Sequence, residues 1–196
     1  MNTTAFGAHQ ADELLGALGE QLAAADACFD LVVIGGSALL ALGLVARVTR
    51  DIDVLAIMEG ELLTPADPLP PALAGARDRV ARDFGLPTDW LNPGPTDLLQ
   101  FGLPAGFLSR VETRAHGPAL TIRYASRLDQ IHFKLYATVD QGAGRHETDL
   151  RALAPSAAEL LAAARWTRTH DPSEGFRQEL AAALAHLGVT DVDLEA

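Results

Sequence analysis

Two aspartates separated by one residue, Asp51 and Asp53, are the side chains of this sequence best suited to chemistry. They lie in residues 50–55, a segment that predicts a β-strand. Because side chains on a strand alternate between its faces, both carboxylates should point the same way, about 7 Å apart. Two carboxylates held so close repel each other, and a bound cation would relieve this repulsion. Hard oxygen ligands of this kind suit Mg²⁺ (or Mn²⁺), which usually completes its coordination with substrate phosphate oxygens.

A second chemical feature precedes this strand, in the consecutive residues Gly35, Gly36 and Ser37. They follow an apolar run that predicts a strand, and a short apolar helix comes after them. Glycines let backbone N–H groups approach an anion, the serine adds a hydroxyl, and the start of a helix carries partial positive charge. A nucleoside triphosphate with its metal would fit such a turn.

Each half of this pattern also has a simpler interpretation. The glycines could form only a tight turn, Asp51 could cap the strand, and Asp53 could be solvated. Either half alone favours that interpretation, whereas the two halves at this spacing favour a metal–nucleotide site. Arg47 and Arg50 lie between them and could bind phosphate oxygens with two bonds each, or could equally balance the aspartates.

The glycine turn, followed by Thr-Arg-Asp-Ile-Asp at residues 49–53, resembles the polymerase-beta type nucleotidyltransferase fold. It is most similar to small bacterial members, which include toxin-like transferases of abortive-infection systems. Lys134 in a Lys-Leu-Tyr-Ala run and Asp149 in a His-Glu-Thr-Asp-Leu run resemble later elements of those proteins, so the resemblance covers about residues 30–153.

The resemblance implies a metal-dependent transfer of a nucleoside monophosphate from an NTP to a hydroxyl acceptor. The acceptor would be tRNA or another RNA, a protein or a small molecule, and the protein could be a toxin with an antitoxin-like partner. It implies catalytic roles for Asp51, Asp53, Lys134 and Asp149, with the first two as metal ligands. Without the resemblance, Lys134 is expected in solvent beside the apolar stripe of its helix, and Asp149 is expected as a surface carboxylate.

A third carboxylate, which the wider fold carries on a later strand, is missing from the best candidate strand, residues 120–124. Glu112 and Asp149 are the available substitutes. The alternative function is therefore a catalytically silent module of the same fold that binds a nucleotide or a partner. A dinucleotide-binding domain is disfavoured, because no Gly-x-Gly-x-x-Gly follows the first strand.

The predicted fold class is α/β (α+β), a nucleotidyltransferase-like mixed β-sheet flanked by helices, with C-terminal helices packed on it. We expect one domain over residues 1–196, with a core at about 30–153 and a helical extension at about 155–190. Apolar periodicity and turn residues also predict a set of individual elements. These are helices at 9–25, 71–84, 156–168 and 172–187, a hairpin joining 107–113 to 119–125, and loops at 62–71 and 87–95.

Composition indicates the cellular compartment of the protein and the classes of partner it can bind. Its single cysteine excludes an internal disulfide, and no apolar run approaches the ~20 residues that span a bilayer. We therefore predict a cytoplasmic protein without a membrane partner.

The formal net charge of -11 does not favour binding to nucleic acid, although acidic and basic residues nearly balance over 47–168. An RNA acceptor is therefore neither supported nor excluded. The C-terminal helices could provide a homodimer face.

Overall fold

The computed structural model describes residues 5–190, in which the chain forms two compact units. The first unit runs to Leu103 and resumes over Leu108–Ala125, and the second contains Pro104–Phe107 and the chain from Ser126 onward. The single domain expected over 1–196 stays a prediction.

The first unit is built on a mixed β-sheet, which confirms the predicted α/β class with a mixed sheet. Its strands are β1 (Phe29–Ile34), β2 (Ile52–Glu59), β3 (Leu62–Pro65), β4 (Leu91–Asn92), β5 (Glu112–Ala115) and β6 (Leu120–Tyr124). The strand order is β3-β2-β1-β6-β5, and β4 pairs with β2 beside this path. The β1–β6 and β2–β4 pairs are parallel, whereas the other three pairs are antiparallel.

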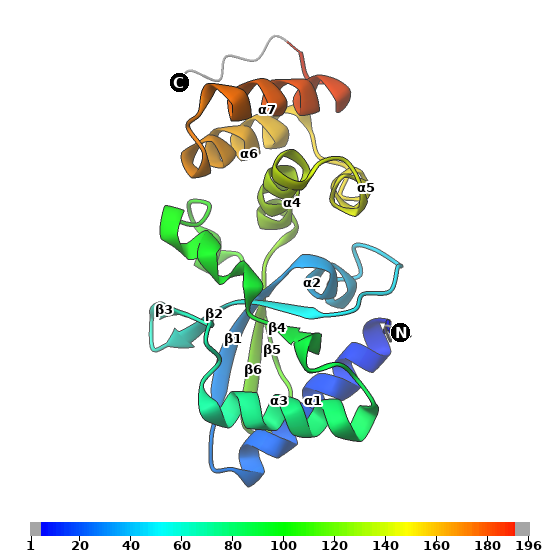
Figure 1. Ribbon diagram of the computed structural model, residues 1–196, viewed down its shortest axis with the longest axis vertical. Helices are drawn as coiled ribbons and strands as arrows, with labels where there is room; N and C mark the ends of the chain where they lie inside the picture. The colour runs from blue at the N-terminus through cyan, green and yellow to red at the C-terminus, as the bar shows by residue number, and fades with distance from the viewer. Residues whose placement is uncertain (1–4, 191–196) are drawn as a thin grey trace. The chain divides into compact units, whose positions relative to one another are not determined.

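Helices flank this sheet (Figure 1). They are α1 (Ala8–Ala24), α2 (Gly35–Ala41) and α3 (Pro71–Phe84), with 3₁₀ turns at η1 (Thr88–Trp90) and η2 (Gly94–Phe101). Leu14, Leu18 and Leu22 give α1 the predicted apolar face, and all three are fully buried. Figure 1 shows α1 and α3 side by side, and their apolar residues belong to one core with those of the sheet.

The two faces of β2 have different surroundings. Ile52 and Val54 belong to the core that α1 and α3 share with the sheet. Asp53 lies between them in sequence, so its side chain projects from the opposite face. The chemistry predicted for Asp53 therefore belongs to the face of β2 that does not carry this core.

Several elements differ from the sequence-based expectations. Gly35 and Gly36, expected as a turn, are the first two residues of α2, and the strand expected at 50–55 begins at Ile52, so Asp51 precedes it. Residues 62–65 form strand β3 at the edge of the sheet, where Pro65 ends the strand without removing an interior hydrogen bond. Residues 107–109 form the 3₁₀ turn η3 (Phe107–Ser109), so the predicted strand at 107–113 is shorter and begins at Glu112. The segment 87–95, expected as a loop, contains η1 and β4.

The second unit consists of helices. They are α4 (Arg127–Gln141), α5 (Arg145–Ala152), α6 (Ala157–His170) and α7 (Glu174–His186). Ser126 caps α4 by accepting a hydrogen bond from the backbone N–H of Asp129, and Ser156 forms a capping box with Glu159 at the start of α6. Within the described residues, no helix has both the length and the apolar composition needed to cross a membrane.

Candidate functional site

Asp53 is the second residue of β2, and the neighbouring strands fix its surroundings. It lies opposite Ile34, the last residue of β1, and beside Asn92 of the parallel strand β4. The Nδ2 atom of Asn92 donates a hydrogen bond of 3.1 Å to Oδ1 of Asp53. The Oδ1 atom of Asn92 in turn accepts a hydrogen bond of 3.0 Å from the backbone N–H of Gly94. The carboxylate of Asp53 is therefore oriented by the adjacent strand.

The first glycine after β1 brings the backbone close to this carboxylate. Gly35 has a φ angle of +74°, in the left-handed region that favours glycine. A Cβ atom at this position would lie only 2.1 Å from Oδ2 of Asp53. Both the backbone conformation and the available space therefore require a glycine here.

A guanidinium group and a hydroxyl group lie against the second glycine. A Cβ atom on Gly36 would lie 2.9 Å from Nη2 of Arg47 and 2.9 Å from Oγ1 of Thr49. Arg47 also donates from Nη1 to the carbonyl oxygen of Val48 at 2.9 Å. One of the two predicted arginines is thus located at the glycine turn, whereas Arg50 is exposed at the surface.

Asp51 is linked to the same turn through Thr49. The Oγ1 atom of Thr49 donates to Asp51, with the backbone carbonyl oxygen at 3.3 Å and the carboxylate Oδ1 at 3.4 Å. The same Thr49 Oγ1 atom lies against Gly36. The backbone of Thr49 is fixed by a two-way pairing with Phe6, with N–O distances of 2.8 and 2.9 Å. Asp51 and Asp53 therefore flank one two-glycine turn, and both side chains are half-buried.

This donor set fits a metal ion that is accompanied by phosphate. Among residues 5–190, no group of three or more histidine, cysteine or acidic side chains could hold a metal by itself. Mg²⁺ needs no such cage, because it is commonly held by one or two carboxylates together with substrate phosphate oxygens. Asp51 and Asp53 are the residues that would hold the ion, and Arg47 is the cation placed to meet a phosphate group.

The hydroxyl of Ser37 lies outside the cluster formed by the two aspartates, the two glycines and Arg47. Its side chain is 3% exposed and lines a pocket together with Ile52, whose side chain projects from the face of β2 opposite to Asp53. The structure therefore brings Gly35, Gly36, Arg47, Asp51 and Asp53 together, but it does not place the Ser37 hydroxyl among them.

Lys134 and Asp149 form an ion pair inside the second unit. The Nζ atom of Lys134 on α4 lies 2.8 Å from Oδ2 of Asp149 on α5, and the two side chains are 5% and 1% exposed. The expectations of a solvated Lys134 and a surface Asp149 are therefore wrong. Of the apolar stripe expected on this helix, Ile131, Leu135 and Val139 are buried and Leu128 is half-buried. Lys134 is buried beside the stripe because α5 supplies the opposite charge.

Glu112 does not join the two aspartates. It lies on β5, whose residues pair with β6, and β1 separates β6 from β2. Three interstrand spacings of about 4.8 Å put Glu112 roughly 14 Å from β2. Its carboxylate accepts hydrogen bonds from Arg114, at 2.9 Å for the Nε donor.

Two residues of this site were not predicted as functional. Asn92 contacts Asp53 across 39 positions of sequence, in a segment whose prolines and glycine indicate only a loop. Thr49 occurs in the motif, but its role depends on the pairing with Phe6. Neither long-range pairing has a local signal in the sequence.

Comparisons with protein families, curated proteins and solved structures give no match for this chain. The resemblance to nucleotidyltransferases therefore rests on the residues quoted above.

Proposed function

We propose that this protein is a metal-dependent nucleotidyltransferase, which transfers a nucleoside monophosphate from an NTP to a hydroxyl acceptor. The observation that supports this proposal is the convergence of Asp53, Asp51 and Arg47 on Gly35 and Gly36, the first two residues of α2. Two carboxylates and one guanidinium lie there beside a backbone without side chains. A metal–triphosphate complex carries both charges that such a site would complement.

The chain's own residues would act mainly by positioning and electrostatics. Arg47 would bind phosphate oxygens of the NTP, and the glycines would leave room for the phosphates to approach the backbone. Asp51 and Asp53 would hold Mg²⁺ or Mn²⁺, which when bound neutralises phosphate charge. Asn92 would keep Asp53 in the required orientation.

The reaction would be an in-line displacement at the α-phosphorus. A bond forms between the acceptor oxygen and phosphorus while the bond to the pyrophosphate oxygen breaks. The proton of the acceptor hydroxyl passes to a carboxylate oxygen of the site or to water, and pyrophosphate leaves. Asp149 and Lys134 keep their proposed catalytic roles, which the variants described below test.

The transfer assay uses α-³²P-labelled NTPs with Mg²⁺ or Mn²⁺ and separate pools of total RNA, protein and small hydroxyl compounds. Asp51→Asn and Asp53→Asn should each abolish label transfer, because each removes one charge of the metal pair. Asp83→Asn, an exposed aspartate on α3 that pairs with Arg82, is the matched control and should keep full activity. Transfer that survives both site variants would refute the proposal.

A second candidate function is a catalytically silent module of the same fold. The ion pair between Lys134 and Asp149 favours it, because the lysine predicted to offset charge is already neutralised. The distance of Glu112 from β2 also favours it. Tight, metal-dependent NTP binding without label transfer to any acceptor would identify this second function, and binding should still be lost in Asp53→Asn.

An abortive-infection toxin with an antitoxin-like partner remains the biological role suggested by the resemblance. Expression of the wild-type protein and of Asp53→Asn in a bacterial host tests this role, because only the wild-type protein should arrest growth.

A further inference from the structure

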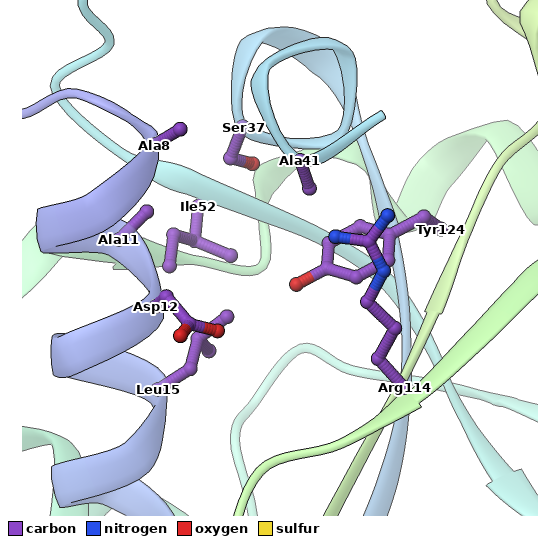
Figure 2. Close-up of a pocket in the computed structure, with 9 residues that line it drawn as sticks. All are labelled: Ala8, Ala11, Asp12, Leu15, Ser37, Ala41, Ile52, Arg114 and Tyr124. Carbon is purple, nitrogen blue, oxygen red and sulfur yellow. The ribbon is translucent and has the colours of Figure 1, made fainter. Parts of the chain in front are cut away.

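A small pocket lies in the first unit, on the face of β2 that carries the core. It has a volume of about 190 Å³. Figure 2 shows that α1, α2, β2, β5 and β6 all contribute side chains to its wall. The apolar part of the lining consists of Ala8, Ala11, Leu15, Ala41 and Ile52. The volume is below the roughly 300–1,000 Å³ of sites for drug-sized ligands, so the pocket suits a small metabolite.

One polar group in this pocket has no hydrogen-bond partner. The Oγ atom of Ser37 is buried and makes no hydrogen bond with any described residue. A buried hydroxyl without a partner is unfavourable, so such groups in folded proteins usually have one. Ser37 faces the pocket, where a bound molecule can supply this partner.

Asp12 and Tyr124 line the pocket, and His116 contacts both of them from outside its lining. Nδ1 of His116 lies 3.3 Å from Oδ1 of Asp12, and Nε2 of His116 lies 3.2 Å from the Tyr124 hydroxyl. Burial lowers the pKa of His116 and raises the pKa of Tyr124. A neutral His116 can then accept a hydrogen bond from the Tyr124 O–H. Asp12 keeps its second carboxylate oxygen at the pocket, where Figure 2 shows the group projecting from α1.

A positive charge lies on another side of the pocket. Arg114 projects from β5, and its guanidinium carbon lies 5.5 Å from the centre of the Tyr124 ring. Its Nε and Nη2 atoms donate to Glu112. Its Nη1 donors have no acceptor among residues 5–190 and can bind a ligand. The pocket therefore presents a carboxylate on α1 and a guanidinium on β5, with the Ser37 hydroxyl on α2.

We propose that this pocket binds a small zwitterion, a free amino acid or an amino-carboxylate of similar size. The ammonium group would bind Asp12, and the carboxylate would bind Arg114 and the Ser37 hydroxyl. The apolar lining accommodates a short aliphatic side chain. This site goes beyond the nucleotidyltransferase proposal, because it uses the opposite face of β2 and none of the residues that would hold the metal.

The test measures binding to the full-length protein by isothermal titration calorimetry, with thermal shift as a second readout. The probes are L-alanine, L-serine and L-valine. Butyrate and n-butylamine each carry only one of the two charges. At least one amino acid should bind, and both single-charge probes should bind at least tenfold more weakly.

Three variants locate the binding. Ala41→Leu should abolish it by filling the pocket, whereas Ala24→Leu, at the exposed end of α1, should leave it unchanged. Asp12→Asn should weaken binding at least tenfold, whereas the adjacent exposed Glu13→Gln should not. Arg114→Met should weaken amino-acid binding at least tenfold and leave the affinity for n-butylamine unchanged.

Two results would overturn the proposal. The first is that no amino acid binds at 10 mM to protein whose circular dichroism spectrum is that of a folded chain. The second is binding that survives Ala41→Leu or that does not distinguish amino acids from the single-charge probes. Label transfer by the same preparations is measured separately, so failure of this proposal is distinguishable from failure of the nucleotidyltransferase proposal.

Discussion

Replacing Lys134 with methionine is expected to destabilise the second unit strongly. Its ammonium group lies 2.8 Å from Asp149, and the two side chains are 5% and 1% exposed. Methionine preserves most of the side-chain length but leaves the carboxylate of Asp149 buried without its counter-charge. Breaking a buried ion pair by removing one partner costs about 3–5 kcal/mol.

The size of the expected effect makes the measurement decisive. In a chain of this length, 1 kcal/mol corresponds to about 2–4 °C in melting temperature, so Lys134→Met should melt roughly 6–20 °C lower. Urea denaturation followed by circular dichroism gives the free energy of unfolding directly. Asp149→Leu should cost a similar amount, because it leaves the ammonium group buried without the carboxylate of Asp149.

The double variant Lys134→Met with Asp149→Leu distinguishes a charge effect from a packing effect. An apolar pair in place of a buried ion pair is often neutral or stabilising, so the double variant should recover most of the lost stability. A single variant that loses less than about 1 kcal/mol would refute this reasoning. A double variant as unstable as the singles would also refute it. If the stable double variant retains full label transfer, neither residue is catalytic.

Three further predictions concern other contacts. Asn92→Ala should lower label transfer by about 10–100-fold without changing the melting temperature by more than about 3 °C, because it frees Asp53 from the hydrogen bond that orients it; transfer at the wild-type rate would contradict the assigned role. Gly35→Ala should lower the free energy of unfolding by about 2 kcal/mol or more and abolish NTP binding, because the new Cβ would collide with Oδ2 of Asp53 at a φ of +74°; urea denaturation and NTP titration check both effects. Arg127 holds the pKa of Glu159 at about 2, below its ordinary 4.5, so this carboxylate stabilises the fold above pH 4.5 and the contribution is lost as the pH falls toward 2. After a discount for solvent screening, Glu159→Gln should cost about 1–2 kcal/mol at pH 7 and almost nothing at pH 2, and an equal loss at both pH values would exclude this linkage.

The sequence predicted those parts of the fold that depend on local periodicity. The repeat of Leu14, Leu18 and Leu22 identified α1, and the two apolar runs around the glycine turn identified β1 and β2. The edge strand β3 was missed because the prolines of the segment 62–71, of which only Pro65 belongs to the strand, are equally typical of a loop. Such a strand is defined by pairing with β2, which no local pattern records.

The candidate site was predictable to a similar extent. The aspartates and glycines lie within 19 residues and share a recognisable motif, whereas Asn92 reaches Asp53 only through the parallel pairing of β4. The burial of Lys134 was missed for a related reason. Periodicity on α4 shows which residues are apolar, but it does not show that α5 brings a carboxylate to the lysine.

Ile52 and Asp53 are consecutive residues, yet they contribute to two different environments on either side of one strand. A ligand that shifted the backbone at Ile52 would also move Asp53, the next residue on β2. Binding on the two sides would then be energetically coupled, and thermodynamic linkage requires that each ligand change the affinity of the other by the same factor. A single strand would thereby let the concentration of a small solute set the protein's response to nucleotide.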